Sequence, residues 1–159
     1  SIKKRNQIME NSTEKKISAY IHLSTFSQYI IPFGNYIFPI ILWTSKKDES
    51  EFVDHNGKQV LNFQLSVLIY SLVLAMIAIP VFLFTVLRNI SFNELINNDD
   101  IIFEHFDYGN SIGLLTIGAL ALFAIAAIKV AEFFLIIYAS VKASNGEEYS
   151  YPLTISFLK

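Results

Sequence analysis

YIIPFGNYIFPIILW, residues Tyr29 to Trp43, is the stretch that decides the fold of this chain. It is apolar enough for a lipid bilayer, yet Pro32, Gly34 and Pro39 interrupt it, and both residue types disfavour a continuous helix. Two placements fit the stretch. One is a single long kinked span, and the other is a helical hairpin that enters a membrane, turns at IPFGN and returns on the same side.

The composition indicates an all-α integral membrane protein. Of the 159 residues, 53% are hydrophobic and 16% are charged, whereas a typical soluble domain has roughly 25% charged residues. No charged residue occurs in 65–87 or in 112–128, and an uncharged apolar run of about 18 residues is typical of a membrane helix. A soluble helical bundle would need a polar shell for which little sequence is left.

The chain divides into a tail and one membrane domain. Residues 1–16 are expected to form a flexible cytoplasmic tail, and residues 17–159 a single domain. Pro32 and Gly34 mark the break of its hairpin. The parts of the domain are expected in this order: a short hairpin of re-entrant or half-length arms at 17–45, a long transmembrane helix at 57–88, an acidic outer loop at 89–110, a second long transmembrane helix at 111–143, and an extended C-terminal segment at 144–159.

The basic residues orient this domain. Cytoplasmic loops of membrane proteins are enriched in Lys and Arg, and here the tail, the linker after the hairpin and the C-terminal segment carry most of them. The loop between the two long helices has Arg88 as its basic residue, against five acidic ones. Both flanks of the hairpin and both termini are therefore placed in the cytoplasm. Each arm is also shorter than the roughly 20 residues of a span, which favours the hairpin.

Two stripes of polar side chains flank the linker. Each falls at helical spacing on one narrow face of its helix. Polar side chains within membranes hydrogen-bond across helix contacts, so we expect the stripes to meet and join the hairpin to the first long helix. A hydrated pathway or binding groove is the alternative. The first stripe comprises Ser18, His22, Thr25 and Tyr29, and the second comprises His55, Gln59, Asn62 and Ser66.

One pair of charges lies in the second long helix. Lys129 and Glu132 are three residues apart, so they are neighbours on the helix surface. An ionisable residue at membrane depth is a candidate functional residue. Lys129 also lies near the inner interface, where its stem can reach the head groups. We expect the pair to serve anchoring and assembly, with a proton or partner contact as the alternative.

Several other classes of function lack support in the sequence. The net charge of −2 and the absence of a basic stripe argue against nucleic acid as a partner. With no cysteine and three widely spaced histidines, no cofactor or metal is expected. His22 and Ser24 point apart on a helix, and the apolar segments hold no pair of carboxylates. An enzyme is not expected.

A series of short motifs resembles a known family. The motifs run in order from residue 17 to residue 159 and are similar to the bacterial family related to the chloroplast inner-envelope translocon protein Tic-twenty. The resemblance implies a small helical membrane protein of the bacterial cytoplasmic (inner) membrane with both termini on one side. The motifs are His22-Leu23-Ser24, Pro32-Phe33-Gly34, Pro39, Trp43, Asp54, Asn56-Gly57-Lys58, Asn62-Phe63-Gln64-Leu65-Ser66 and Tyr149 to Leu153.

Two functions remain from the residues and this resemblance. The first is a non-enzymatic accessory or scaffold subunit of a larger membrane protein complex, with a protein-handling complex as one candidate. The second is a small channel or transporter, because broken helices often line substrate sites. In both, the partners are the lipid bilayer and either other proteins or further copies of the chain.

Overall fold

The computed structural model describes residues 2–89 and 108–159, and in these ranges the regular elements are all helices. The chain divides into two compact units. Unit 1 comprises Ser1–Leu68 and Val130–Lys159, and unit 2 comprises Ile69–Lys129. Each unit is described by itself below.

The N-terminal part of the chain differs from the sequence prediction. Residues 1–16 were predicted as a flexible tail, whereas helix α1 spans Ile2–Ser24 and includes all but the first of them. The segment is polar and basic, and residues such as Lys, Arg, Gln and Glu are good helix formers whether or not they are buried. The low hydropathy of the segment therefore indicates that it is exposed, but it does not exclude a helix.

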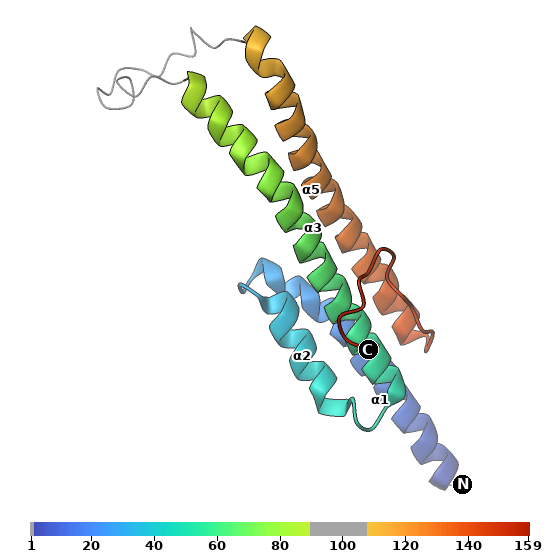
Figure 1. The fold of residues 1–159 in the computed structure, drawn as a ribbon. Helices are drawn as coiled ribbons and strands as arrows, with labels where there is room; N and C mark the ends of the chain where they lie inside the picture. Colours follow the sequence, from blue (N-terminus) through green and yellow to red (C-terminus); the bar gives the residue numbers. More distant parts are fainter. Residues whose placement is uncertain (1, 90–107) are drawn as a thin grey trace. The chain divides into compact units, whose positions relative to one another are not determined.

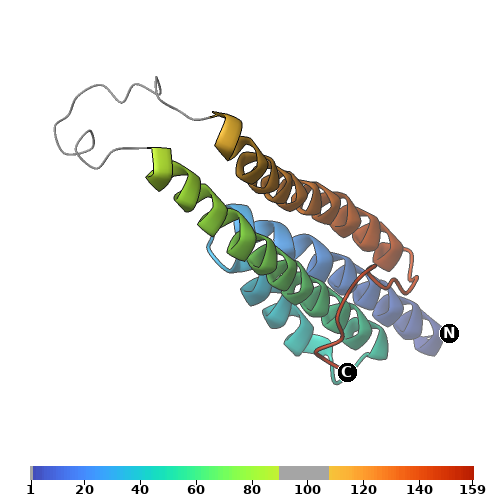
Figure 2. The ribbon, with the colours of Figure 1, turned by 45° about the horizontal axis from the view of Figure 1, so that its top comes forward.

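The hairpin predicted at 17–45 is present as a helix–turn–helix. A short 3₁₀ helix, η1 (Thr25–Tyr29), continues from α1, and α2 (Gly34–Lys46) returns beside α1 (Figures 1 and 2). Between them Phe33 adopts a left-handed conformation with φ 61°. The predicted break at Pro32 and Gly34 is thus confirmed. The position of the hairpin in a membrane stays a prediction.

Gly34 is required where the two arms of the hairpin meet. A Cβ atom at this position would lie 2.8 Å from the backbone carbonyl of Ser27 and 2.6 Å from its Oγ. The turn is closed by backbone hydrogen bonds from Ile31 N to Ser27 O, at 2.8 Å, and from Gly34 N to Ile31 O, at 3.0 Å. Any side chain at position 34 would push η1 and α2 apart.

Helix α3 spans Glu51–Asn89, so it begins six residues before the predicted start at 57. Ser50 supplies its N-cap, since its Oγ accepts a hydrogen bond of 3.3 Å from the backbone N–H of Val53. The charged linker made this start hard to place, because helix first turns favour acidic residues and the linker is rich in them. The acidic residues Glu51 and Asp54 both lie in that first turn.

Helix α5 spans Tyr108–Ser144, and Gly146 terminates it, as predicted, from the turn that follows. Gly146 has φ 79°. Its N–H donates to Ala143 O at 2.9 Å, and the N–H of Glu147 donates to Lys142 O at 3.0 Å. These two bonds form a Schellman motif, which satisfies the last carbonyls of the helix. Most of the outer loop predicted at 89–110, namely residues 90–107, lies outside the described residues.

The C-terminal segment from residue 145 onward is not helical and follows the unit 1 part of α3 (dark red in Figure 1), with turns at residues 145–146 and 152–153. The predicted extended segment is present only in part, because Leu153 has a left-handed backbone conformation (φ 54°) within the second turn. Its hydrogen bonds to α3 are described with the site below.

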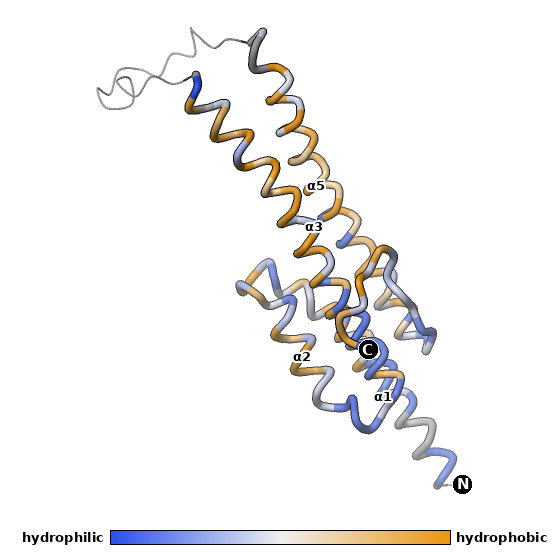
Figure 3. Tube along the Cα trace, in the orientation of Figure 1, coloured by the Kyte–Doolittle hydropathy of each residue, from blue (hydrophilic) through white to orange (hydrophobic). Residues whose placement is uncertain are grey.

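Among the described residues, two helices are long and apolar enough to cross a membrane, at Glu51–Thr85 and Ile112–Ser144. In unit 2 these helices expose large apolar side chains such as Met76, Phe82 and Phe123, and Figure 3 shows the apolar colour dominating both. A soluble helix pair of this length would bury such side chains. The exposed surface fits contact with lipid.

Candidate functional site

Unit 1 has a core that contains many polar side chains. Two hydrogen-bonded groups stand out. The first, which we name the His22 cluster, consists of His22, Asn56 and Tyr151. The second, the Glu132 cluster, consists of Gln28, Asn35, Gln64 and Glu132. Buried polar groups are stable only when hydrogen-bonded, so these contacts define how the elements of unit 1 fit together.

The His22 cluster joins three segments that are distant in sequence. Nε2 of His22 lies 2.8 Å from Oδ1 of Asn56, and Nδ1 lies 2.7 Å from the Tyr151 hydroxyl. The Asn56 amide nitrogen donates to Phe52 O at 2.8 Å, which leaves Oδ1 as the acceptor. His22 therefore carries its proton on Nε2 and donates to Asn56, while Tyr151 donates to Nδ1. The neutral imidazole uses both ring nitrogens.

Burial keeps the imidazole neutral. His22 has no exposed surface, and this desolvation lowers its pKa to about 4, against the smaller opposing effect of the bond to Asn56. Burial likewise raises the pKa of the Tyr151 hydroxyl well above its ordinary value. The tyrosine ring stacks on Phe63 with centroids 4.0 Å apart. Both groups are thus uncharged near neutral pH.

The second predicted stripe binds the C-terminal segment. Gln59 Oε1 accepts from Tyr151 N at 3.3 Å, and Ser66 Oγ accepts from Ile155 N at 2.8 Å. Asn62 makes three bonds: its Oδ1 accepts from the backbone N–H groups of residues 157 and 158, at 3.1 and 2.8 Å, and its Nδ2 donates to the carbonyl of residue 158 at 2.9 Å. The side chains replace the strand partner that an extended backbone needs.

The first stripe behaves differently along its length. Ser18, His22 and Thr25 are fully buried, whereas Tyr29 is exposed at the turn and stacks near Phe26. Thr25 Oγ1 donates to the carbonyl of His22 at 2.7 Å in its own helix. Ser18 Oγ is buried without a hydrogen-bond partner in the described part of the chain, as is Nε2 of His55 in the second stripe.

We expect the two stripes to hydrogen-bond to each other, but in the structure each has other partners. His22 bonds to Asn56, which lies next to the stripe residue His55, and the second stripe bonds to the C-terminal segment. Helical spacing gives the direction of a side chain only to within one residue on either side. His22 thus joins the hairpin to α3, but the second stripe joins α3 to the C-terminal segment, which was not predicted.

The Glu132 cluster connects α5 to the hairpin and to α3 within unit 1. Glu132 is 1% exposed. Its Oε1 accepts from the amide nitrogens of Gln64, at 3.0 Å, and Gln28, at 3.2 Å. Asn35 Nδ2 in turn donates to Oε1 of Gln64 at 2.7 Å. A buried carboxylate is expensive unless donors surround it. The amides of Gln28 in η1 and Gln64 in α3 are such donors, and Asn35 in α2 holds the Gln64 amide in place.

The other member of the predicted charge pair, Lys129, is the last residue of unit 2 and is half-buried. Pairing between Lys129 and Glu132 stays a prediction. The predicted helical position of both residues is confirmed, because each lies in α5.

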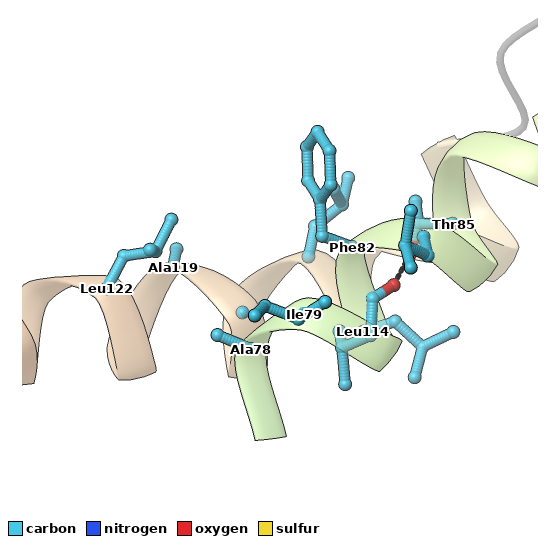
Figure 4. Close-up of a pocket in the computed structure, with 11 residues that line it drawn as sticks. Ala78, Ile79, Phe82, Thr85, Leu114, Ala119 and Leu122 are labelled. Atoms are coloured by element: carbon cyan, nitrogen blue, oxygen red, sulfur yellow. Dashed lines mark hydrogen bonds between the residues drawn. The ribbon is translucent and has the colours of Figure 1, made fainter. Parts of the chain in front are cut away.

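Unit 2 has an apolar pocket of about 470 Å³ between its two helices (Figure 4). Thr85 is the polar side chain among the residues that line this pocket. Its hydroxyl donates a hydrogen bond to Val81 O in its own helix at 2.8 Å. A pocket of this kind suits hydrocarbon rather than water or ions.

Among the described residues, no group of three or more His, Asp or Glu side chains could hold a metal ion.

A family model matches residues 13–158 of this chain. The chain belongs to the magnetosome magnetite crystal formation protein family, MamF/MmsF. The resemblance to the Tic-twenty-related family was therefore a misassignment, because the two names denote different families. No curated protein and no solved structure matches the chain. Membership of a magnetosome family agrees with a small bacterial membrane protein having two long apolar helices.

The sequence analysis did not predict the buried contacts of five residues of the polar core, and three of them appeared there only as motif residues of the resemblance (Asn56, Gln64 and Tyr151). The five are Gln28, Asn35, Asn56, Gln64 and Tyr151. A signal for three of them existed. Gln28, Asn35 and Gln64 are amides inside otherwise apolar segments, and an amide at membrane depth must find a hydrogen-bond partner. Asn56 and Tyr151 lie in polar surroundings in the sequence, where nothing separates a buried side chain from an exposed one.

Proposed function

We propose that this chain takes part in magnetite crystal formation as a non-enzymatic accessory or scaffold subunit in the magnetosome membrane. Family membership supports the process, and the two long apolar helices support the location. The scaffold role rests on the polar core of unit 1.

The single observation that carries this role is that the buried polar side chains of unit 1 are used to hold its own segments together. The buried ionisable groups are His22 and Tyr151 in one cluster and Glu132 in the other, and each forms hydrogen bonds with side chains of other segments. None of these three groups lines the apolar pocket of unit 2 or the pocket of about 200 Å³ at the open end of the hairpin. A hydrated pathway would instead leave such groups facing water.

The same contacts support a rigid platform. Asn62, Ser66 and Gln59 bind an extended segment that would otherwise be free, and the Glu132 cluster ties the hairpin to α3 and α5. Satisfied polar networks make a core specific and rigid. A scaffold needs one defined surface, whereas a transporter needs two alternating states.

The proposal predicts stable partners and no transport. We would purify the tagged chain from its own cells in mild detergent, and we expect a stoichiometric membrane protein to remain bound. Reconstituted liposomes should show no flux of protons, Fe²⁺ or Na⁺ above that of empty vesicles. In cells that lack the chain, electron microscopy should show altered crystal size or number, restored by the wild type. Ion flux without a bound partner would favour the channel and overturn the scaffold role.

A further inference from the structure

The tip of the hairpin in unit 1 is apolar and exposed. Ile30 is 85% exposed and Phe33 is 72% exposed. Phe33 also holds a left-handed backbone conformation, which is uncommon for a bulky residue. The apolar surface continues along the outer face of α2 through Ile37, Phe38 and Ile41. Such a surface, presented by a closed turn, needs an apolar environment.

The open end of the hairpin is of opposite character. Lys15 and Lys16 precede the first arm, and Lys46 and Lys47 follow the second. The pocket at this end is lined by side chains of both arms, including Glu14 and Lys46, so the two ends lie together. Trp43 lies one turn before the second pair of lysines, with Lys47 over its ring at 5.1 Å. Lysines and a tryptophan at one level are typical of a membrane interface.

The hydrogen bonds between the hairpin and α3 show how far the hairpin extends along that helix. At the open end Trp43 Nε1 donates to Asp54 at 2.9 Å, and near the tip Asn35 donates to Gln64 at 2.7 Å. These α3 residues are ten positions apart, about 15 Å at 1.5 Å per residue. This depth is about half of the roughly 30 Å hydrocarbon core of a bilayer. The hairpin therefore stays within one leaflet.

We propose that the hairpin, residues 17–46, is a wedge whose tip and outer face contact the acyl chains of one leaflet only, so that the chain prefers membranes that are convex on the hairpin side. The inference relies on the membrane location in the proposed function but not on the scaffold role. Lipid is favoured as the occupant because the basic ends, the interfacial tryptophan and the half-bilayer length all match a leaflet.

The preference for curvature follows from the depth. An element that occupies only the head-group and upper acyl region adds area to one leaflet, and the binding of such elements depends on curvature. The long helices, which have the length to cross both leaflets, add area to each. The hairpin alone makes the chain asymmetric across the bilayer.

The depth can be tested with single cysteines, since the chain has none. In proteoliposomes, Phe33→Cys should resist a membrane-impermeant maleimide added on either side and react after detergent is added. Lys47→Cys should react from one side without detergent. If position 33 is labelled from the side opposite to position 47, the segment spans the membrane fully. If both positions are labelled from the same side, the hairpin lies in water. Oxidative dimerisation through position 33 would mean that a second copy covers the tip. Each of these three results would overturn the wedge.

The curvature preference can be tested with tethers pulled from giant vesicles. The fluorescent chain, with its hairpin on the outer surface, should be enriched about twofold or more in the tether over the flat membrane. The variant Ile30→Ser/Phe33→Asn/Ile41→Ser should lose this enrichment. Asparagine is chosen at position 33 because it tolerates the left-handed backbone conformation there. The apolar control Ile30→Val/Phe33→Leu/Ile41→Val should keep it. Matched Trp43 emission would show that both variants are folded. Equal density of the wild-type chain in tether and vesicle would overturn the proposal, as would enrichment of the polar variant.

Discussion

The hydroxyl of Tyr151 donates a 2.7 Å hydrogen bond to Nδ1 of His22, across 129 positions of the chain. This bond fastens the C-terminal segment to α1, and the imidazole passes the connection on to Asn56 in α3. Three segments of unit 1 thus depend on one neutral side chain.

Tyr151→Phe should destabilise the fold by about 1–3 kcal/mol, because Nδ1 of the buried His22 would lose its donor. The ring contact with Phe63 would remain, so the loss reports the hydroxyl. Unfolding in detergent and protease sensitivity of the C-terminal segment would both measure it. Tyr149→Phe is the matched control and should change stability by less than about 0.5 kcal/mol. Equal effects of the two changes would contradict the role given to the bond.

Stability should fall as the pH drops from about 6.5 to about 4. His22 has a pKa of about 4 in the fold and about 6.5 when unfolded. In this window the unfolded chain binds a proton that the folded chain does not, so the contribution of His22 decreases with falling pH by about 3 kcal/mol in total and is constant below pH 4. Unfolding free energies at pH 7 and pH 4 would measure the change. The variant His22→Gln should lack this part of the pH dependence, and an identical slope in both proteins would exclude His22 as its source.

Gly57→Ala should destabilise unit 1, whereas Gly113→Ala should not. A Cβ atom at position 57 would overlap the indole ring of Trp43, while one at position 113 would meet nothing within 4 Å. Overpacking costs about 1–3 kcal/mol, and replacing an open helical glycine gains up to about 1 kcal/mol. Thermal unfolding of both variants would show opposite signs. Combining Gly57→Ala with Trp43→Ala should recover part of the loss, and no recovery would mean that the clash is elsewhere.

The helices of this fold could be predicted from sequence because their causes are local. The long uncharged runs, the break at Pro32 and Gly34 and the stop at Gly146 each act within a few residues, and all three were predicted correctly. The predicted start of the first helix, at residue 17, was wrong because hydropathy measures exposure rather than helix formation.

The polar core could be predicted only in part, because its partners are set by packing over long distances. His22, Asn62 and Ser66 were expected to join the hairpin to the first long helix. His22 does so through Asn56, whereas Asn62 and Ser66 bind the C-terminal segment. Their partners, Asn56 and the C-terminal backbone, are 34 or more positions away. A stripe on a helix shows that a face has a polar partner but not which segment provides it.

Glu132→Leu should destabilise unit 1 by about 2–4 kcal/mol, and Glu132→Gln by less. Leucine would leave the amide N–H groups of Gln28 and Gln64 without an acceptor, and each such buried donor costs about 1–3 kcal/mol. Glutamine retains an oxygen that can accept. Folded yield in detergent and unfolding free energy would give the order. Equal stability of the two variants would mean that the carboxylate is not an acceptor in the core.

The last prediction concerns which side of the membrane each end of the hairpin faces. Reporter fusions after Arg5 and after Ser50 should report the cytoplasm, and a fusion after Asp99 the opposite side. The lysine-rich ends favour the cytoplasm, and the structure brings residues 13–17 and 46–50 to the walls of one pocket. Two ends that share a pocket cannot lie on opposite sides of a bilayer about 30 Å thick. If the fusion after Arg5 instead matches the fusion after Asp99, residues 17–45 cross the membrane once, and the hairpin packing of α1 against α2 is not the arrangement in the membrane.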